Sequence, residues 1–191
     1  MPKSLAVRKA QLGKTDKIQM SSQVIASTRN RARTLTEAEI SDIEHEKTLY
    51  PDNQAVGLEA LKIVQNYQGW VSDESLLAIA EYLNLSVADL EGVATFFNLI
   101  YRQPVGKNVI LFCDSVSCWI CRGDDIKDYL SDKLKIDYGQ TTEDNEFTLI
   151  PIPCLGDCNN APVMMVGQDL HRNLTKTGID EIIDQYRNKS A

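Results

Sequence analysis

Residues 108–121 read NVILFCDSVSCWIC, a short and mostly apolar run that leads directly into three cysteines, Cys113, Cys118 and Cys121. The run before Cys113 is typical of a buried strand. Cys118 and Cys121 have the C-x-x-C spacing of a redox dithiol, whereas Cys113 and Cys118 have the C-x4-C spacing of two metal ligands. Because Cys118 belongs to both pairs, the stretch leaves thiol–disulfide exchange and metal binding open.

A second pair of cysteines, Cys154 and Cys158, follows another predicted strand at residues 147–150. Both pairs are therefore expected on loops at the ends of strands. If these two strands are neighbours in one sheet, four thiolates meet although the pairs are far apart in the sequence. Gly156, inside the C-x3-C spacer, allows the backbone to fold closely around a bulky ligand.

Four thiolates without a nearby histidine are typical of zinc or of an iron–sulfur cluster. The two histidines of the chain, His45 and His171, lie outside the cysteine region and are interpreted as surface residues. Structural zinc usually takes C-x2-C spacers, and a [2Fe–2S] cluster, which is wider than one zinc ion, suits wider ones. The spacing favours the cluster and leaves a zinc-stapled interaction domain open. Asp114 and Asp157 add negative charge beside the site, which is expected to lower its reduction potential.

Composition places the chain among ordinary globular proteins, with 191 residues of which 43% are hydrophobic and 25% charged. No apolar run approaches the ~18–20 residues that span a bilayer, and the N-terminus lacks the apolar core of a signal peptide. We therefore expect an intracellular chain without direct membrane insertion. All five cysteines lie between positions 113 and 158, and this clustering favours metal or redox chemistry over a secreted disulfide scaffold.

Charge is distributed unevenly along the chain. Residues 1–35 carry eight Lys or Arg and one acidic residue, a net charge of +7, whereas residues 36–191 carry 12 basic and 26 acidic residues, a net charge of −14. The acidic body argues against nucleic acid as a ligand. The basic N-terminal extension, residues 1–35, is interpreted as a partner-binding arm or as a solvated tail, with an organellar transit peptide as a weaker alternative.

Residues 36–102 are predicted to form a bundle of four short amphipathic helices. A capping box at 36–39 begins the first helix, which ends before Pro51, and the others are expected near 56–69, 72–83 and 86–97. The rhythm resembles a helix-turn-helix, but the fourth helix contains Asp89 and Glu91 and no Lys or Arg, which argues against DNA binding.

Residues 103–191 show a different pattern, with strands predicted at 108–112, 147–150 and 162–166 and helices at 124–134 and from Thr175 or Thr177 onward. The order β-α-β-β-α indicates a small open sheet with helices packed against it. The predicted fold class is α+β, a helical bundle followed by an α/β domain.

The cysteine loops and the bundle together resemble a known family. The segments FCDSVSC (112–118), GQTTEDNEFTLIPIPCLGDCNNAPVMMV (139–166), LEALKIVQNYQGWVS (58–72) and LEGVATFFNLIY (90–101) are similar to the small [2Fe–2S] subunit of the NADH-dehydrogenase module of respiratory complex I. This resemblance to thioredoxin-like [2Fe–2S] ferredoxins extends from about residue 36 to the C-terminus. It implies a thioredoxin-like domain that carries the cluster, preceded by a helical bundle.

The resemblance also implies the ligands and the partners. Cys113, Cys118, Cys154 and Cys158 would each supply one thiolate to a single [2Fe–2S] cluster, and Cys121 departs from the family pattern. The implied role is electron transfer in an NADH:quinone oxidoreductase on the cytoplasmic side of the inner membrane, or the matrix side in a eukaryote. Related subunits occur in NAD-linked hydrogenases and formate dehydrogenases, so the type of complex stays open.

The chain contains no G-x-G-x-x-G or P-loop motif, so FMN and NADH are expected on a partner flavoprotein, beside other peripheral-arm iron–sulfur subunits. We expect no catalytic residue on this chain alone. The bundle is expected to dock the flavoprotein through apolar and aromatic side chains that include Phe96, Phe97 and Tyr101. A thiol–disulfide oxidoreductase that uses Cys118 and Cys121 remains a remote alternative.

Overall fold

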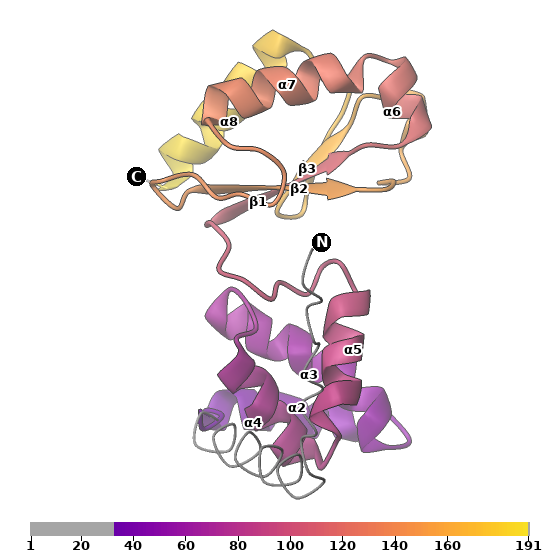
Figure 1. The fold of residues 1–191 in the computed structure, drawn as a ribbon, viewed down its shortest axis with the longest axis vertical. Coiled ribbons are helices and arrows are strands. Elements are labelled where there is room, and N and C mark those ends of the chain that lie inside the picture. Colours follow the sequence, from indigo (N-terminus) through magenta and orange to yellow (C-terminus); the bar gives the residue numbers. More distant parts are fainter. Residues whose placement is uncertain (1–32, 191) are drawn as a thin grey trace, which may run out of the picture. The chain divides into compact units, whose positions relative to one another are not determined.

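The computed structural model describes residues 33–190, so residues 1–32 of the predicted basic extension lie outside the described residues. The chain divides into two compact units, with the boundary between Arg102 and Gln103 (Figure 1). Within the described residues, no helix is both long enough and apolar enough to cross a membrane.

The first unit is helical. Its four helices are α2 (Glu37–Lys47), α3 (Asn53–Gln68), α4 (Asp73–Leu83) and α5 (Val87–Phe96). Each helix begins after a polar residue whose side chain accepts a hydrogen bond from a backbone N–H of the first turn, as N-caps do; these residues are Thr36, Asp52, Ser72 and Ser86. The predicted capping box of α2 is present with both of its hydrogen bonds.

A single apolar core holds these helices together, and Leu61 and Ile79 at its centre have no exposed surface. One charged side chain is buried beside it: Glu39, which is 0% exposed. Arg33 donates two hydrogen bonds to its carboxylate, at 3.0 and 2.7 Å, and the backbone N–H of Thr36 donates a third at 2.8 Å. Burial raises the pKa of Glu39, but the hydrogen bonds from Arg33 and Thr36 outweigh burial and leave the pKa below its ordinary value.

The second unit contains a four-stranded mixed sheet with the strand order β2-β1-β3-β4. Its strands are β1 (Asn108–Cys113), β2 (Phe147–Ile152), β3 (Met164–Val166) and β4 (Asp169–His171). β1 pairs in parallel with β2 and antiparallel with β3, and β4 pairs antiparallel with β3. The predicted α+β class, with a helical bundle followed by a sheet domain, is confirmed.

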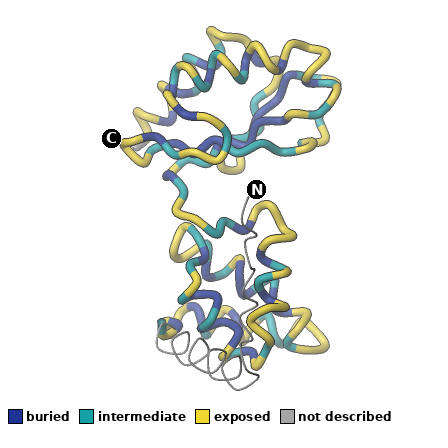
Figure 2. The backbone as a smooth tube through the Cα atoms, in the orientation of Figure 1, coloured by how far each residue is buried: buried dark blue, intermediate teal, exposed yellow. Residues whose placement is uncertain are grey.

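Two helices cover one face of this sheet, α7 (Gly123–Leu134) and α8 (Lys176–Ser190), as Figure 1 shows. The two helices lie side by side: Tyr129 and Lys133 of α7 both donate hydrogen bonds to Asp180 of α8, at 2.9 and 2.6 Å. Figure 2 shows buried positions concentrated along β1 and β2, and fully buried Phe112 and Phe147 mark the centre of this core.

Two short elements of this unit depart from the sequence-based prediction. The helix α6 (Val116–Ile120) contains Cys118, and β4 forms a hairpin with β3 across Gly167, which has a φ of 59°. α6 contains five residues and β4 three. Segments this short show neither the 3.6-residue nor the two-residue apolar period on which sequence prediction depends.

Candidate functional site

The first cysteine loop is positioned by the sheet. Cys113 is the last residue of β1 and is 2% exposed, and its backbone N–H donates to the carbonyl of Val163 at 3.3 Å. The backbone N–H of Asp114 donates to the carbonyl of Ile152 at 3.1 Å. α6 then turns the chain back and buries Cys118, which is 1% exposed, in one small apolar cluster with Cys113 and Val163.

The second cysteine loop lies next to the first because β1 and β2 are parallel neighbours, with Cys113 paired to Ile152. Parallel strands end at the same edge of a sheet, so Cys154, two residues beyond Ile152, begins its loop beside Cys113. The Sγ atoms of Cys154 and Cys158 are 3.8 Å apart, and the N–H of Gly156 donates to Cys154 Sγ at 3.3 Å. β1 and β2 are therefore neighbours in the sheet, which was the condition for the four thiolates to meet.

Gly156 shapes this second loop. Its φ is +82°, a left-handed conformation that glycine adopts without strain. A Cβ placed at this position would meet nothing within 4 Å, so the space around it is open. The glycine is required for the turn of the backbone, which directs its own N–H toward the sulfur of Cys154.

The four thiols affect one another. Burial raises the pKa of the Cys118 thiol to about 11, and its neighbours Cys113 and Cys158 add to the rise. The pKa of Cys154 is lowered, first by the Gly156 N–H and then by Cys158, with a smaller contribution from Cys113. Each pair thus interacts within itself and with the other pair. The structure brings together the four cysteines expected to act as ligands.

This donor set fits a [2Fe–2S] cluster. Within residues 33–190, no three His, Cys, Asp or Glu side chains are close enough together to hold a single metal ion. The thiols are instead arranged as two pairs on two loops, and a [2Fe–2S] cluster takes two protein ligands on each of its two irons. Thiolates are the ligands that such clusters use, and the Gly156 N–H is already directed at one of the sulfurs.

Cys121 is separate from these four. It follows α6 as an exposed residue, and the interactions described above among Cys113, Cys118, Cys154 and Cys158 do not involve it. Within the C-x-x-C sequence, one thiol is thus buried and the other faces solvent. The structure groups Cys118 with Cys113.

Asp157, the residue before Cys158, has hydrogen-bond partners both within its loop and outside it. Its carboxylate accepts hydrogen bonds from Asn160 Nδ2 at 2.7 Å and from Arg172 Nε. These hydrogen bonds, first that of Asn160 and then that of Arg172, hold the pKa of Asp157 below its ordinary value. Asp157 therefore carries negative charge beside the site, as expected, and its pairing with Arg172 is a feature that the sequence analysis did not include.

Sequence reasoning missed Arg172 and the outward face of α6. Arg172 directly follows β4, a strand that was not predicted, so nothing in the sequence pointed to its contact with the loop. On α6, Val116, Trp119 and Ile120 are all exposed apolar side chains. The signal available for these was the WI dipeptide between two cysteines, in a stretch too short for a periodicity argument.

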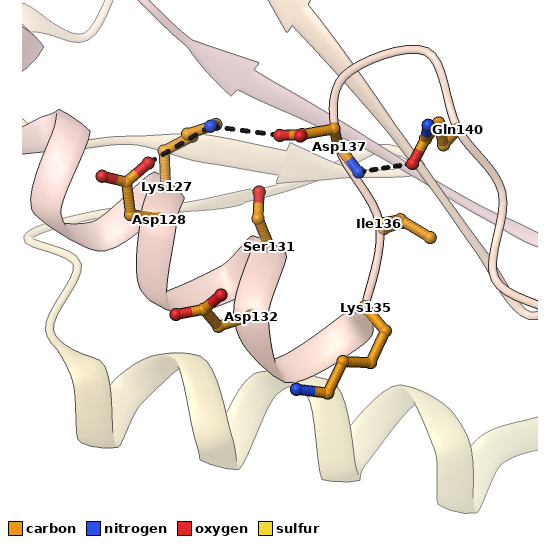
Figure 3. Close-up of a pocket in the computed structure, with 8 residues that line it drawn as sticks. All are labelled: Lys127, Asp128, Ser131, Asp132, Lys135, Ile136, Asp137 and Gln140. Carbon is orange, nitrogen blue, oxygen red and sulfur yellow. Dashed lines mark hydrogen bonds and ion pairs between the residues drawn. The ribbon is translucent and has the colours of Figure 1, made fainter.

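A polar hollow of about 500 Å³ lies between α7 and the loop that follows it (Figure 3). Within it, Lys127 lies between the carboxylates of Asp128 and Asp137, with Nζ–oxygen distances of 3.2 and 3.3 Å. The backbone N–H of Asp137 donates to Gln140 at 2.9 Å. These charges pair with one another, and none of the five cysteines lines the hollow, so it is separate from the thiol site.

Comparison with known proteins agrees with this geometry. A family model described as thioredoxin-like [2Fe–2S] ferredoxin matches residues 43–187. The chain is 46% identical to the E subunit of NADH-quinone oxidoreductase from Buchnera aphidicola over 153 residues, which are 80% of this chain and 94% of that protein. It is 48% identical to the Escherichia coli K12 protein of the same name, over 80% of this chain and 92% of that protein.

Among solved structures, the fold is similar to a chain of an NAD+-reducing [NiFe]-hydrogenase in the air-oxidized state. The TM-score is 0.60 and the identity 20%, and the match covers 70% of this chain and 23% of the hydrogenase chain. At this identity the likeness concerns the fold alone. Because the family model covers most of the sequence and the relatives match over nearly their full length, this chain belongs to the thioredoxin-like [2Fe–2S] ferredoxin family.

Proposed function

We propose that this chain is the [2Fe–2S] electron-transfer component of an NADH:quinone oxidoreductase, the counterpart of the E subunit of the bacterial enzyme. The observation that carries the proposal is the meeting of two cysteine pairs at the ends of the parallel strands β1 and β2, in a chain 44–48% identical to proteins of that name. The likeness to the hydrogenase supports the fold and does not favour a hydrogenase complex over this one.

In this proposal Cys113, Cys118, Cys154 and Cys158 hold the cluster, which when bound takes up one electron at a time and passes it on. The chain's own residues supply the surroundings. Cys113 and Cys118 are buried and keep water from one side, whereas Cys154 and Cys158 are exposed. The exposed side is where a redox partner can approach. Solvent exposure and hydrogen bonds to sulfur also influence the reduction potential of a cluster.

The partner in this proposal is a flavoprotein that carries FMN and oxidises NADH, assembled with other iron–sulfur subunits of a peripheral arm. This chain acts as part of the enzyme and has no catalytic residue of its own. We place it at the cytoplasmic face of the inner membrane, or on the matrix side in a eukaryote. Two observations support this: the relatives are named as a subunit of NADH-quinone oxidoreductase, and the sequence contains no G-x-G-x-x-G or P-loop motif.

The bundle supplies the docking surface for that flavoprotein. Phe96 is 81% exposed and packs edge-on against Phe97, with ring centroids 5.1 Å apart, and Leu99 beside them is also exposed. An exposed aromatic cluster of this kind is typical of an interaction site. Tyr101 is half-buried, and burial raises its pKa, so we assign the contact to Phe96, Phe97 and Leu99.

The test is anaerobic purification of the full chain, followed by assays of iron, acid-labile sulfide and zinc. The expected result is about two irons and two sulfides per chain, with an EPR signal that appears on reduction. A colourless protein that contains zinc and no sulfide would contradict the proposal and favour the zinc-stapled alternative.

A further inference from the structure

The segment after β4 is joined to the second cysteine loop by three sets of contacts. The backbone N–H of Asn173 donates to the carbonyl of Asn160 at 2.8 Å, and the N–H of Leu174 donates to the carbonyl of Pro162 at 3.1 Å. Next to these, Arg172 donates from Nε to the carboxylate of Asp157. The end of the loop that carries Cys158 is therefore held from outside the loop.

The ion pair in this set is partly protected from water. The Asp157 side chain is 21% exposed and the Arg172 side chain 51% exposed. Asp157 immediately precedes Cys158, so its charge lies within a few ångströms of that residue's backbone. At that range the solvent and salt do not fully screen the charge, because the Debye length is about 8 Å at physiological ionic strength.

Reduction adds one negative charge to a site that already contains four thiolates. A free carboxylate at Asp157 would oppose that charge and lower the reduction potential, whereas a carboxylate paired with a guanidinium has little net effect. Arg172 is thus placed to act on the cluster through Asp157, without touching a cysteine itself.

We propose that Arg172 is a positioning residue of the cluster site, which holds the Cys158 end of the loop and offsets the charge of Asp157 so that the reduction potential stays higher than Asp157 alone would allow. This rests on the proposed function, in which the four cysteines bind a [2Fe–2S] cluster. Arg172 becomes a determinant of potential that is distant from the cysteines in the sequence.

The experiment is a double-mutant cycle on the full-length, cluster-loaded protein. R172Q, D157N, R172K and the D157N/R172Q double variant are compared with the wild type in EPR-monitored redox titrations and in the rate of iron release to a chelator. R187Q is the matched control, because Arg187 is also an exposed arginine in an ion pair, with Asp144 at 3.9 Å, and has the same charge. Iron and sulfide are assayed first in every variant.

The potential should become more negative in R172Q and more positive in D157N, and it should return close to the wild-type value in the double variant and in R172K. Iron release should be about two- to fivefold faster in R172Q and in D157N, because either change removes the ion pair that holds the loop. R187Q should match the wild type in both measurements.

Two results would overturn the inference while leaving the proposed function intact. The first is a loaded R172Q protein whose potential and iron release match those of R187Q. The second is a potential that moves in the same direction in R172Q and D157N, because a charge effect requires opposite signs. If R172Q cannot be loaded, D157N and the double variant still decide the sign. A wild-type protein without iron and sulfide would overturn the proposed function and this inference together.

Discussion

Cys118 and Cys121 belong to the same C-x-x-C sequence, yet Cys118 is buried beside Cys113 and Cys121 faces solvent. The difference arises from α6, which ends at Ile120, so that Cys121 follows the helix as its C-terminal cap. At the scale of single residues, contacts with other thiols therefore distinguish the four candidate ligands from Cys121, since Cys154 and Cys158 are exposed as well.

Serine variants test this distinction directly. Replacing Cys113, Cys118, Cys154 or Cys158 with serine should each remove the [2Fe–2S] EPR spectrum or change it strongly, because a cluster iron loses a thiolate. Cys121→Ser is the matched control and should leave the spectrum of the reduced protein unchanged. Loss of the spectrum in Cys121→Ser, with Cys118→Ser unaffected, would reverse the assignment.

Gly156 offers a second test at this scale, with a glycine of the same unit as its control. Gly156→Ala and Gly139→Ala both place a side chain at a positive φ, +82° and +79°, with nothing within 4 Å of the added Cβ. Each should lower the free energy of unfolding by about 1–2 kcal/mol. Only Gly156→Ala should also speed iron release, because Gly156 shapes the loop between two ligands.

Thermal or chemical unfolding of both alanine variants, together with iron release to a chelator, makes the comparison. Equal iron release in the two variants would show that the conformation of Gly156 does not matter for holding the cluster, even if both variants are destabilised to the same extent.

At the scale of elements, the start of α2 depends on a buried carboxylate. Glu39 has no exposed surface, and Arg33 pairs with it from outside the helix while Thr36 completes the cap. The helix is therefore anchored both by its apolar face, which includes fully buried Ile43, and by a charge pair at its first turn. A charge that is buried in this way stabilises the fold only while its partner is present.

Arg33→Ala is expected to destabilise the first unit by about 3 kcal/mol, because Glu39 would keep a buried negative charge without its partner. Lys62→Ala is a suitable control, since it breaks an ion pair on the surface of α3. In that pair, Lys62 Nζ lies 2.7 Å from Glu59 Oε2. That change should cost about 0.5 kcal/mol or less. Chemical denaturation followed by circular dichroism measures both, and similar losses in the two variants would show that the Arg33–Glu39 pair contributes no more than a surface pair.

At the scale of the whole molecule, the two units carry different kinds of side chains. The second unit contains all five cysteines and exposes Val116, Trp119 and Ile120, whereas the first contains no cysteine and exposes Phe96, Phe97 and Leu99. In the proposed function, the second unit holds the cofactor and the first recognises a partner. This division allows the two roles to be altered separately.

Phe96→Ser should weaken co-purification with the flavoprotein at least tenfold, because exposed aromatic side chains at the centre of an interface commonly contribute more than 1.4 kcal/mol to binding. It should leave the iron content and the stability of the bundle unchanged, since Phe96 is 81% exposed. Leu49→Ser, at another exposed apolar position of the same unit, is the control. Equal binding by both variants would place the docking surface elsewhere.

Much of the fold was predictable from local patterns in the sequence. The apolar runs of β1 and β2 and the caps at Thr36 and Ser72 are strong signals, because each depends only on neighbours along the chain. The C-x4-C and C-x3-C pairs each follow a predicted strand, so the sequence indicated that the four thiolates would meet if those two strands were neighbours. α6 and β4 were not predictable, because five and three residues are too few for an apolar period to repeat.

The sequence by itself determined the change from a helical part to a part with strands, the main helices and strands, and the residue types that can bind a cluster. Only the tertiary structure decided that β1 and β2 are parallel neighbours, that Cys118 is buried while Cys121 is exposed, and that Arg172 pairs with Asp157. The physical reason is that strand order and ion pairing depend on contacts between residues distant in the chain, which local apolar patterns and residue spacing do not encode.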